Sequence, residues 1–353
     1  MNITIVGAGN IGLQFAVHCR EKKNAVKIYT NKNVSPNLTI VNDDGNIIHK
    51  CSGLQISNDE KSCFFNADLI FITYPAFMTE QIEKTIYPFI NTGKMICLVP
   101  GTGGGELVFK KCIQKGAIVF GLQRVPSVSR IIEPYKTVRC VGYRTTLHVA
   151  AIQSKYSQQC ATIIHDIFDM PVEILPNYLN ITLTPSNPLL HTSRLFNLFG
   201  EKQKYIKIPL FYEDWNDETS KLLLSMDEEL QKICKAIPLN LNYVKSLKKH
   251  YESPDYVSLT NKIKSIKGFK GILTPMLEED GHYVPDFNSR YFTADFNYGL
   301  SIIIQISKLT GLSHPYMDMV YNWYKNLNTK NGCFDINKYG IETIDDLVDF
   351  YNK

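Results

Sequence analysis

The chain has 353 residues, of which 44% are hydrophobic and 20% are charged, so its composition is that of an ordinary globular protein. This length is enough for two domains, since a domain usually contains about 100–200 residues. The formal net charge is only +4 and no basic stripe is interleaved with aromatic residues, so nucleic acid is not an expected partner.

The nine cysteines are scattered, without a Cys-x-x-Cys pair or a His/Cys cluster at zinc-ligand spacing. Neither a disulfide framework nor a metal site is therefore expected, and a reducing, cytoplasmic compartment is favoured. No apolar run approaches the roughly 18 residues that a membrane helix needs, and no N-terminal secretion signal is visible. We expect no membrane association.

A glycine-rich turn, Gly-Ala-Gly-Asn-Ile-Gly at residues 7–12, lies between a predicted strand at residues 2–6 and a predicted helix. In this context the spacing is typical of a dinucleotide-binding fold. The first glycine permits a tight turn, the second lets the backbone approach a pyrophosphate, and the third lets the helix pack on the strand. The alternative is a turn that binds no ligand. Cofactor contacts are predicted for Gly7, Gly9, Asn10, Ile11 and Gly12.

The second predicted strand, at residues 25–30, ends without the acidic residue that commonly holds the ribose of NAD. The chain instead reads Thr30-Asn31-Lys32, which offers hydroxyl, amide and ammonium donors and no carboxylate to repel a 2′-phosphate. We therefore expect NADP(H) to be favoured over NAD(H). The alternative is that Lys32 is simply solvated. An Asp-Asp-Gly sequence at residues 43–45, between two apolar runs, predicts a hairpin.

Strands and helices then alternate as expected of a parallel, doubly wound sheet. Strands are predicted at residues 69–73 and 95–99, with a helix at residues 80–87 between them. The loops after these strands lie at the carboxyl edge, where open α/β sheets bind ligands. The second loop has four glycines within residues 101–105, which suits either close approach of a nicotinamide or a flexible turn. Cofactor contacts are predicted here for Tyr74, Pro75, Pro100 and Gly101.

Strands are also predicted at residues 119–121, 138–141, 147–150 and 172–175, with a helix at residues 156–168. Beyond Pro176 the strand pattern stops, and amphipathic helix patterns follow at residues 218–234, 241–251, 296–309 and 315–327. We therefore predict an α/β fold with two domains. A Rossmann-like doubly wound sheet occupies residues 1–176, and an all-helical C-terminal domain occupies residues 177–353.

Two polar motifs stand out in the predicted helical domain. In Asn187-Pro188-x-x-His191, the proline opens a helix and places His191 one turn in, on the same face as Asn187. Arg290 and Asp295 begin a second helix, where an arginine needs an anion because backbone N–H groups already point outward. The alternatives are a structural histidine and an ordinary Arg–Asp surface pair. Burial of the second helix is predicted by apolar positions at helical spacing, Phe296, Leu300, Ile303 and Ile304.

Together these features resemble the opine dehydrogenases of the octopine/nopaline dehydrogenase family. The resemblance covers nearly the whole chain: the glycine turn, the loop at residues 100–105, the Asn-Pro-x-x-His motif, and Arg290 to Asp295 followed by Tyr-Gly-Leu. It implies that His191 and Asp295 form a catalytic acid/base pair and that Arg290 acts in the substrate pocket. Substrate binding is predicted for Arg290, Asn187 and His191. The family often has an acidic residue where this chain has Ala294, which leaves the local charge and the substrate choice open.

The resemblance implies an NAD(P)H-dependent reduction of the imine formed between a 2-oxo acid, such as pyruvate, and the amino group of an amino acid. Histidine suits proton transfer near neutral pH, a carboxylate supports its charged form, and arginine binds carboxylates with two parallel hydrogen bonds. The expected partners are these small molecules, and a homodimer is considered as the assembly. Two alternatives stay open: a ketopantoate- or 2-hydroxyacid-type reductase of the oxo acid alone, and a non-catalytic NAD(P)H sensor.

Overall fold

The structure, a computed structural model, describes residues 1–327 and 332–353. The chain divides into two compact units: Met1–Thr182 together with Asp349–Lys353, and Leu183–Val348. The sequence pattern places the change from strands to helices at Pro176 and gives no sign that the last residues join the first unit.

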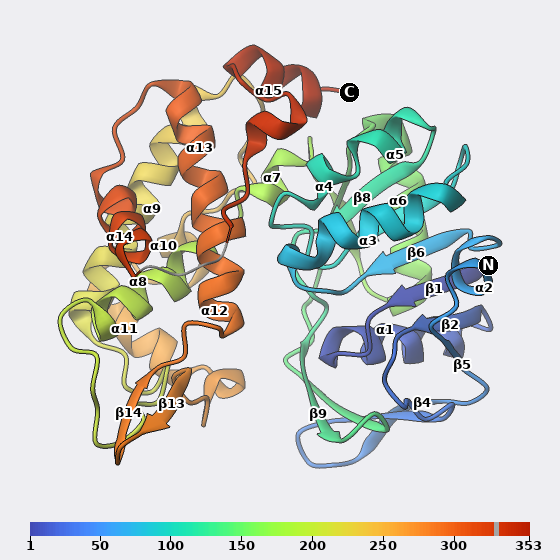
Figure 1. The fold of residues 1–353 in the computed structure, drawn as a ribbon, viewed down its shortest axis with the longest axis horizontal. Coiled ribbons are helices and arrows are strands. Elements are labelled where there is room, and N and C mark those ends of the chain that lie inside the picture. Colours follow the sequence, from blue (N-terminus) through green and yellow to red (C-terminus); the bar gives the residue numbers. More distant parts are fainter. Residues whose placement is uncertain (328–331) are drawn as a thin grey trace. The chain divides into compact units, whose positions relative to one another are not determined.

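The first unit is built on an eight-stranded sheet in the order β12-β11-β8-β7-β6-β1-β2-β5 (Figure 1). From β5 to β8 all neighbouring strands are parallel, β11 is antiparallel to β8, and β12 is parallel to β11. The predicted doubly wound sheet is thus confirmed. The strands are β1 (Asn2–Val6), β2 (Ala25–Tyr29), β5 (Gln55–Ser57), β6 (Leu69–Ile72), β7 (Met95–Leu98), β8 (Ile118–Leu122), β11 (Leu147–Ala151) and β12 (Val172–Ile174).

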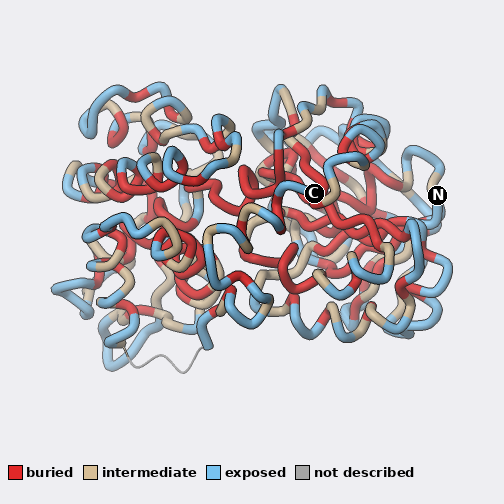
Figure 2. Tube along the Cα trace, turned by 90° about the horizontal axis from the view of Figure 1, so that it is seen from above, coloured by how far each residue is buried: buried red, intermediate tan, exposed pale blue. Residues whose placement is uncertain are grey.

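The order of the sheet reverses between β1 and β6, because the chain first extends it from β1 through β2 to β5 and then returns to the other side. Such a switch point is where ligands of open α/β sheets bind, just beyond the carboxyl ends of the strands. The central strands β6 and β7 are buried along their whole length, as parallel strands covered on both faces are. In Figure 2 the segments inside each unit are mostly buried, and those at its surface are mostly exposed.

A second, four-stranded sheet in the first unit has the order β4-β3-β10-β9. The predicted hairpin at residues 43–45 is confirmed, since β3 and β4 pair antiparallel around it. The bounds are β3 (Leu38–Val41), β4 (Ile47–Cys51), β9 (Val128–Glu133) and β10 (Thr137–Val141). The helices are α1 (Asn10–Glu21), α2 (Glu60–Phe64), α3 (Thr79–Ile86), α4 (Gly105–Val108), α5 (Lys110–Gln114), α6 (Ser157–Phe168) and α7 (Leu179–Thr182), and the boundary between the units falls within α15 (Ile344–Tyr351).

The second unit is helical, as predicted, and it also holds one short hairpin. An aromatic core formed by Phe292, Phe296 and Tyr324 joins its helices, with Phe296 stacked on Tyr324 at 4.2 Å between ring centres. The elements are α8 (Pro188–Phe199), α9 (Asp217–Ala236), α10 (Leu247–His250), α11 (Tyr256–Ser265), β13 (Met276–Glu279), β14 (His282–Pro285), α12 (Arg290–Thr293), the π-helical segment η5 (Asp295–Leu300), α13 (Ser301–Thr310) and α14 (Pro315–Asn326).

The helix predicted at residues 241–251 is wrong over its first half, because only Leu247–His250 is helical. Local hydrogen bonds explain the difference. The Asn240 side chain accepts from the Asn242 N–H, and the Ser246 hydroxyl caps α10 by accepting from the Lys249 N–H. Such side-chain acceptors offer the backbone an alternative to helix, which an apolar spacing pattern does not reveal.

The helix predicted at residues 296–309 is present but composite. It begins as the π-helical segment η5, continues as α13, and follows the short helix α12. The apolar positions predicted to be buried are at most 2% exposed: Phe296, Leu300, Ile303 and Ile304. A π turn inside a helical stretch is frequently found at functional sites.

Candidate active site

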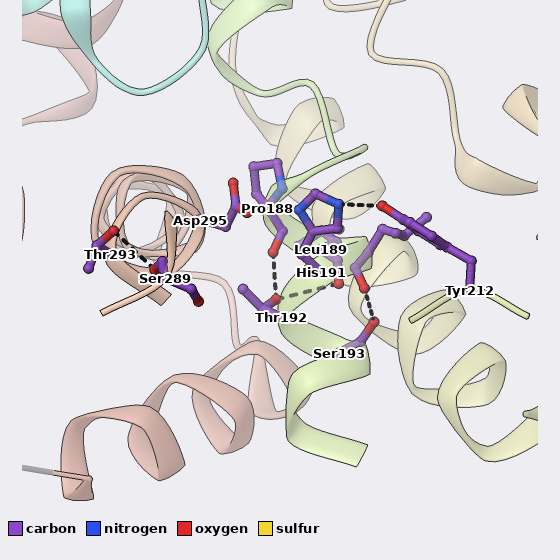
Figure 3. A network of polar contacts seen from close by, with 10 residues as sticks. Pro188, Leu189, His191, Thr192, Ser193, Tyr212, Ser289, Thr293 and Asp295 are labelled. Atoms are coloured by element: carbon purple, nitrogen blue, oxygen red, sulfur yellow. Dashed lines mark hydrogen bonds and ion pairs between the residues drawn. The ribbon is translucent and has the colours of Figure 1, made fainter. Parts of the chain in front are cut away.

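His191 and Asp295 meet in the second unit although they are 104 positions apart in the chain. Pro188 occupies the first turn of α8, which places His191 one turn in, and Asp295 opens the π-helical segment η5. The Nδ1 atom of His191 lies 2.7 Å from the Oδ2 atom of Asp295. Their side chains are 7% and 15% exposed, so the pair is largely shielded from water. Figure 3 shows the two side chains directed at each other.

Close packing of α8 on η5 explains why the two side chains meet. Gly299, one turn after Asp295, lies against the proline that opens α8. A Cβ atom at position 299 would lie 3.0 Å from the Cγ atom of Pro188, so only glycine fits without displacement. The Tyr-Gly-Leu sequence at residues 298–300 therefore contributes to the geometry of the pair.

A second buried side chain contacts His191 and was not predicted from the sequence. The Tyr212 hydroxyl lies 2.9 Å from the Nε2 atom of His191, and Tyr212 is 5% exposed. The Tyr291 ring meets the imidazole edge to face at 4.8 Å between ring centres. Tyr212 lies in no helix or strand, so periodicity gave no signal for it. The only hint is the aromatic run Phe211-Tyr212 followed by Trp215.

Arg290 is exposed at the start of α12, with its Cζ atom 6.0 Å from the centre of the Tyr291 ring. Among the described residues no ion pair joins Arg290 to Asp295, and the aspartate is instead paired with His191. The alternative of an Arg–Asp surface pair is therefore wrong for this structure. Burial raises the pKa of the Tyr212 hydroxyl, and the Arg290 guanidinium lies close enough to lower it by a smaller amount. A fixed positive charge thus lies near the buried pair.

Asn187 stands immediately before α8 and is exposed. Its backbone carbonyl accepts a 3.0 Å hydrogen bond from the His191 N–H, which begins the helix. Its side chain makes no capping hydrogen bond, although asparagine is a favoured helix cap. The amide is therefore exposed beside the helix start that carries His191.

The glycine turn of the first unit has the shape that a dinucleotide needs. Gly7 adopts a φ of +113°, and a Cβ atom at Gly12 would lie 2.1 Å from the Gly7 carbonyl oxygen. At Gly9, by contrast, a Cβ atom would meet nothing within 4 Å. Gly9 also precedes α1, which has no side-chain cap, so its first N–H groups are free of a capping side chain. The residues present fit a pyrophosphate at this helix N-terminus.

The other residues predicted to contact the cofactor lie at the start of α1 and in the loops after β6 and β7. The Asn10 side chain accepts a 2.8 Å hydrogen bond from the Ile131 N–H, so it ties α1 to β9. The half-buried Ile11 packs on the core of the first unit. Tyr74 and Pro75 follow β6 and are half-buried. After β7, Pro100 is half-buried and the buried Gly101 donates its N–H to the Leu122 carbonyl at 2.8 Å.

The three residues after β2 differ in what they offer to a ligand. Thr30 is buried, and its hydroxyl accepts from the Lys32 N–H at 3.1 Å, so it shapes the turn. The exposed Asn31 side chain accepts from the Asn58 amide at 3.1 Å. Lys32 is exposed, and its ammonium group is available to an anion.

One group of metal-ligand type is brought together by the fold in the described part of the chain. Ligand atoms of His18, Glu21 and His49 lie within 4.8 Å of one another. The Glu21 carboxylate already accepts from the Lys50 N–H at 2.9 Å and contacts His49 Nδ1 at 2.8 Å. Burial lowers the pKa of His18 to about 3, and its Nε2 atom lies 3.3 Å from the Tyr143 hydroxyl. These contacts account for the group without an ion.

Two family models match the chain. Residues 174–328 match the alpha-helical domain of NAD/NADP octopine/nopaline dehydrogenase, and residues 3–134 match ketopantoate reductase PanE/ApbA. Among curated relatives, an opine dehydrogenase of Haliotis discus hannai is 27% identical over 326 residues, which is 83% of this chain and 80% of the relative. An octopine dehydrogenase of Pecten maximus is 25% identical, over 76% of this chain and 72% of the relative.

Solved structures share the fold. An octopine dehydrogenase with NADH and L-arginine has a TM-score of 0.83 at 20% identity, over 98% of this chain and 97% of that one. A 2-dehydropantoate 2-reductase of Geobacter metallireducens has a TM-score of 0.65 at 12% identity, over 93% of this chain and the whole of that one. The helical-domain match and the curated relatives name the same class of enzyme, and the solved structures show the same fold. The chain therefore resembles the opine dehydrogenases over most of its length, its helical domain matches the octopine/nopaline dehydrogenase family, and it is an NAD(P)-dependent oxidoreductase.

Proposed function

We propose that this protein condenses a 2-oxo acid with the amino group of an amino acid and reduces the resulting imine with NAD(P)H. Condensation releases one water, and the C=N bond then takes a hydride at carbon and a proton at nitrogen. One NAD(P)H and one proton are consumed per N-(carboxyalkyl) amino acid. The bound cofactor supplies the hydride. The observation that carries this proposal is the buried His191–Asp295 pair within the residues matched by the octopine/nopaline family model.

We propose that His191 transfers protons during this reaction. Proton movement is needed when the amine attacks the carbonyl, when water leaves, and when the imine nitrogen becomes an amine. Imidazole is the side chain best suited to take up and return protons near neutral pH. Asp295, at 2.7 Å from Nδ1, would hold the ring in one orientation and stabilise its charged form.

Arg290 is proposed to bind a substrate carboxylate, since both the oxo acid and the amino acid carry one. Its guanidinium is exposed and has no carboxylate partner among the described residues. A planar guanidinium binds a carboxylate through two parallel hydrogen bonds, which fixes its orientation as well as its charge. The exposed Asn187 amide, beside the start of α8, is proposed to add a neutral hydrogen bond to substrate.

The cofactor is proposed to bind the first unit at the switch point of the sheet, with its pyrophosphate on the glycine turn and its other parts on the loops after β6 and β7. The proposed contacts are Gly7, Gly9, Asn10, Ile11, Gly12, Tyr74, Pro75, Pro100 and Gly101. NADP(H) is proposed to be favoured over NAD(H), because the turn after β2 holds an exposed lysine and no carboxylate. In this turn Lys32 is the proposed partner of the 2′-phosphate, supported by Asn31 and by the shape that Thr30 gives the turn.

The reaction class is tested by following NADPH absorbance with purified protein, an oxo acid and a panel of amino acids. Pyruvate and L-arginine come first in the panel, because structures of octopine dehydrogenase contain them. We expect oxidation only when an oxo acid and an amine are both present. Equal turnover with the oxo acid alone would favour the ketopantoate-type reductase, whose family model matches residues 3–134. Cofactor binding without turnover on any pair would favour a sensor.

The cofactor preference is tested by comparing catalytic efficiency with NADPH and with NADH. We expect NADPH to be preferred, and Lys32→Ala to lower the efficiency with NADPH by about tenfold or more while leaving NADH unaffected, from the usual strength of a charged hydrogen bond. Lys84→Ala, which removes an exposed lysine from α3, is the matched control. Higher efficiency of the unaltered protein with NADH would contradict this preference.

A cytoplasmic location and a homodimer are proposed as well. All nine cysteines are free thiols in this structure, and eight of them are not exposed, which suits a reducing compartment. Within the described chain, no helix is long and apolar enough to span a bilayer. Light scattering of the purified protein tests the assembly, and the mass of a single chain at micromolar concentration would contradict the dimer.

A further inference from the structure

Both ring nitrogens of His191 are occupied in this structure. Nδ1 lies 2.7 Å from the Asp295 carboxylate, and Nε2 lies 2.9 Å from the Tyr212 hydroxyl (Figure 3). An imidazole exchanges protons only at these two atoms. A proton that reaches or leaves Nε2 in this arrangement passes through the Tyr212 oxygen, unless the tyrosine side chain moves away.

The direction of both hydrogen bonds follows from the partners. An ionised Asp295 only accepts, so Nδ1 carries the proton of the neutral ring and Nε2 accepts from the Tyr212 O–H. Burial raises the pKa of the Tyr212 hydroxyl well above its usual value, and neighbouring phenol and carboxylate groups raise it further, whereas Arg290 lowers it. The hydroxyl thus stays protonated at neutral pH and donates to His191.

The ring of Tyr212 stacks on two other aromatic rings. Phe269 stacks on it at 4.0 Å between ring centres and 16° between ring planes. Trp215 lies nearly parallel at 9° and 6.4 Å, and its indole N–H donates to the Ser220 hydroxyl at 2.9 Å. Moving the hydroxyl away from His191 would break the stack of Tyr212 on Phe269. These ring contacts favour the position in which the Tyr212 hydroxyl meets Nε2.

The backbone that carries Tyr212 is anchored by the helix that carries His191. Arg194, one turn after the histidine on α8, is 1% exposed. Its Nε–H donates to the Phe211 carbonyl at 2.9 Å, and its Nη2 donates to the Asp214 carbonyl at 2.8 Å. Burial lowers the pKa of Arg194 to about 10, so it remains charged at neutral pH. One helix thus positions both the histidine and the segment of its tyrosine partner.

We propose that Tyr212 is a further catalytic residue that carries protons between His191 and the substrate, an inference that rests on the proposed function. When the amine attacks the oxo acid, its surplus proton passes to the Tyr212 oxygen while the tyrosine proton moves to Nε2, which gives an imidazolium. The alkoxide oxygen of the adduct takes up the one solution proton that the overall reaction consumes, which gives the neutral carbinolamine. When its C–O bond breaks, the tyrosine proton goes to the leaving hydroxyl group, which departs as water. The nitrogen lone pair forms the C=N bond, and Nε2–H returns its proton to the tyrosine.

Tyr212→Phe tests this role, because it removes the hydroxyl and keeps the ring that packs on Phe269. We expect kcat to fall by about 10²-fold or more, within the range of a lost acid/base group, with an unchanged KM for NADPH and an unchanged melting temperature. Retained or increased kcat would overturn the proposal, since the tyrosine would then only block Nε2 until substrate displaces it.

Tyr205→Phe is the matched control, because it also removes a tyrosine hydroxyl from the second unit, one that donates to the Leu198 carbonyl. It is expected to leave kcat unchanged. The double variant of Tyr212→Phe and His191→Gln should be no slower than the slower single variant, because residues acting in one relay are not additive. Multiplied losses would overturn the relay. Such a result in an active enzyme leaves the proposed function intact, whereas absence of all turnover in the unaltered protein contradicts that function.

A measurement on the unaltered protein does not depend on activity. Nitrogen-15 NMR of the labelled histidine rings, assigned for His191 by the signal that His191→Gln removes, reports which ring nitrogen carries hydrogen. At neutral pH in the absence of substrate we expect Nδ1 to be protonated and Nε2 to be an acceptor. Protonation of Nε2 in the resting protein would contradict the hydrogen bond from Tyr212 and with it the relay.

Discussion

At the scale of single residues, the buried pair of His191 and Asp295 allows the most specific prediction. His191 contacts a carboxylate on one ring nitrogen and a hydroxyl on the other, so its hydrogen-bonding capacity is used completely. We predict that His191→Gln lowers turnover by about 10²–10⁴-fold without changing NADPH affinity, the usual loss of an acid/base group. Asp295→Asn should do similar damage, because it removes the charge that supports the imidazolium. Steady-state kinetics beside cofactor titration measures both, and His282→Gln, in an exposed histidine, is the control. Near-normal turnover across pH would make His191 a structural residue.

For Arg290 we make a different prediction, because this residue is exposed and lacks a carboxylate partner among the described residues. Lysine keeps the charge but loses the two-pronged geometry, at a cost of roughly 1.5–3 kcal/mol for charged hydrogen bonds. Arg290→Lys should therefore raise KM for one substrate by about ten- to a hundredfold. The fold and the NADPH affinity should be kept. Varying each substrate in turn measures the effect, with Arg139→Lys, at an exposed arginine of the first unit, as control. Unchanged constants for both substrates would exclude a carboxylate contact.

At the scale of elements, the turn between β1 and α1 separates packing from ligand binding. At Gly12 a Cβ atom would overlap the Gly7 carbonyl oxygen, whereas at Gly9 it would meet nothing. We predict that Gly12→Ala lowers the free energy of unfolding by about 1–3 kcal/mol or more, as overpacking does. Gly9→Ala should keep the melting temperature yet weaken NADPH binding, because its methyl group would stand where the pyrophosphate approaches. Thermal melts and cofactor titrations measure both effects, and each variant is the control for the other. If Gly9→Ala bound NADPH as tightly as the unaltered protein does, the pyrophosphate would have to bind elsewhere.

At the scale of the whole molecule, the end of the chain stabilises the first unit. Tyr351 donates to the buried Glu106 carboxylate at 2.6 Å, and the Thr182 hydroxyl contacts the same oxygen. We predict that Tyr351→Phe lowers the free energy of unfolding by about 1–3 kcal/mol, because a buried acceptor loses a partner. Both tryptophans, Trp215 and Trp323, lie in the second unit, so fluorescence follows that unit while circular dichroism follows both.

In urea titrations of Tyr351→Phe, the transition seen by circular dichroism should move to lower concentration, with a smaller effect on tryptophan fluorescence. Tyr316→Phe, in an exposed tyrosine of α14, is the control and should change neither transition. An unchanged circular-dichroism midpoint would show that the contact between Tyr351 and Glu106 does not stabilise the first unit.

Local patterns in the sequence determined the doubly wound sheet, the glycine turn, the hairpin at residues 43–45 and the helical character of the second unit. Strand alternation, turn residues and helix spacing are properties of neighbouring residues, so a single chain reveals them. The motifs around His191 and Asp295 were likewise visible, and the family resemblance suggested that they form a pair. Their roles stay predictions.

Only the tertiary structure decided which side chains meet. Tyr212 reaches His191 from an irregular segment that Arg194 anchors, and no spacing rule connects positions 191 and 212. Sequence patterns also gave no sign of three further features: the π-helical segment, the return of the last residues to the first unit, and the non-helical stretch at residues 241–246. Each depends on hydrogen bonds and packing, several between residues far apart in the chain, which periodicity does not record.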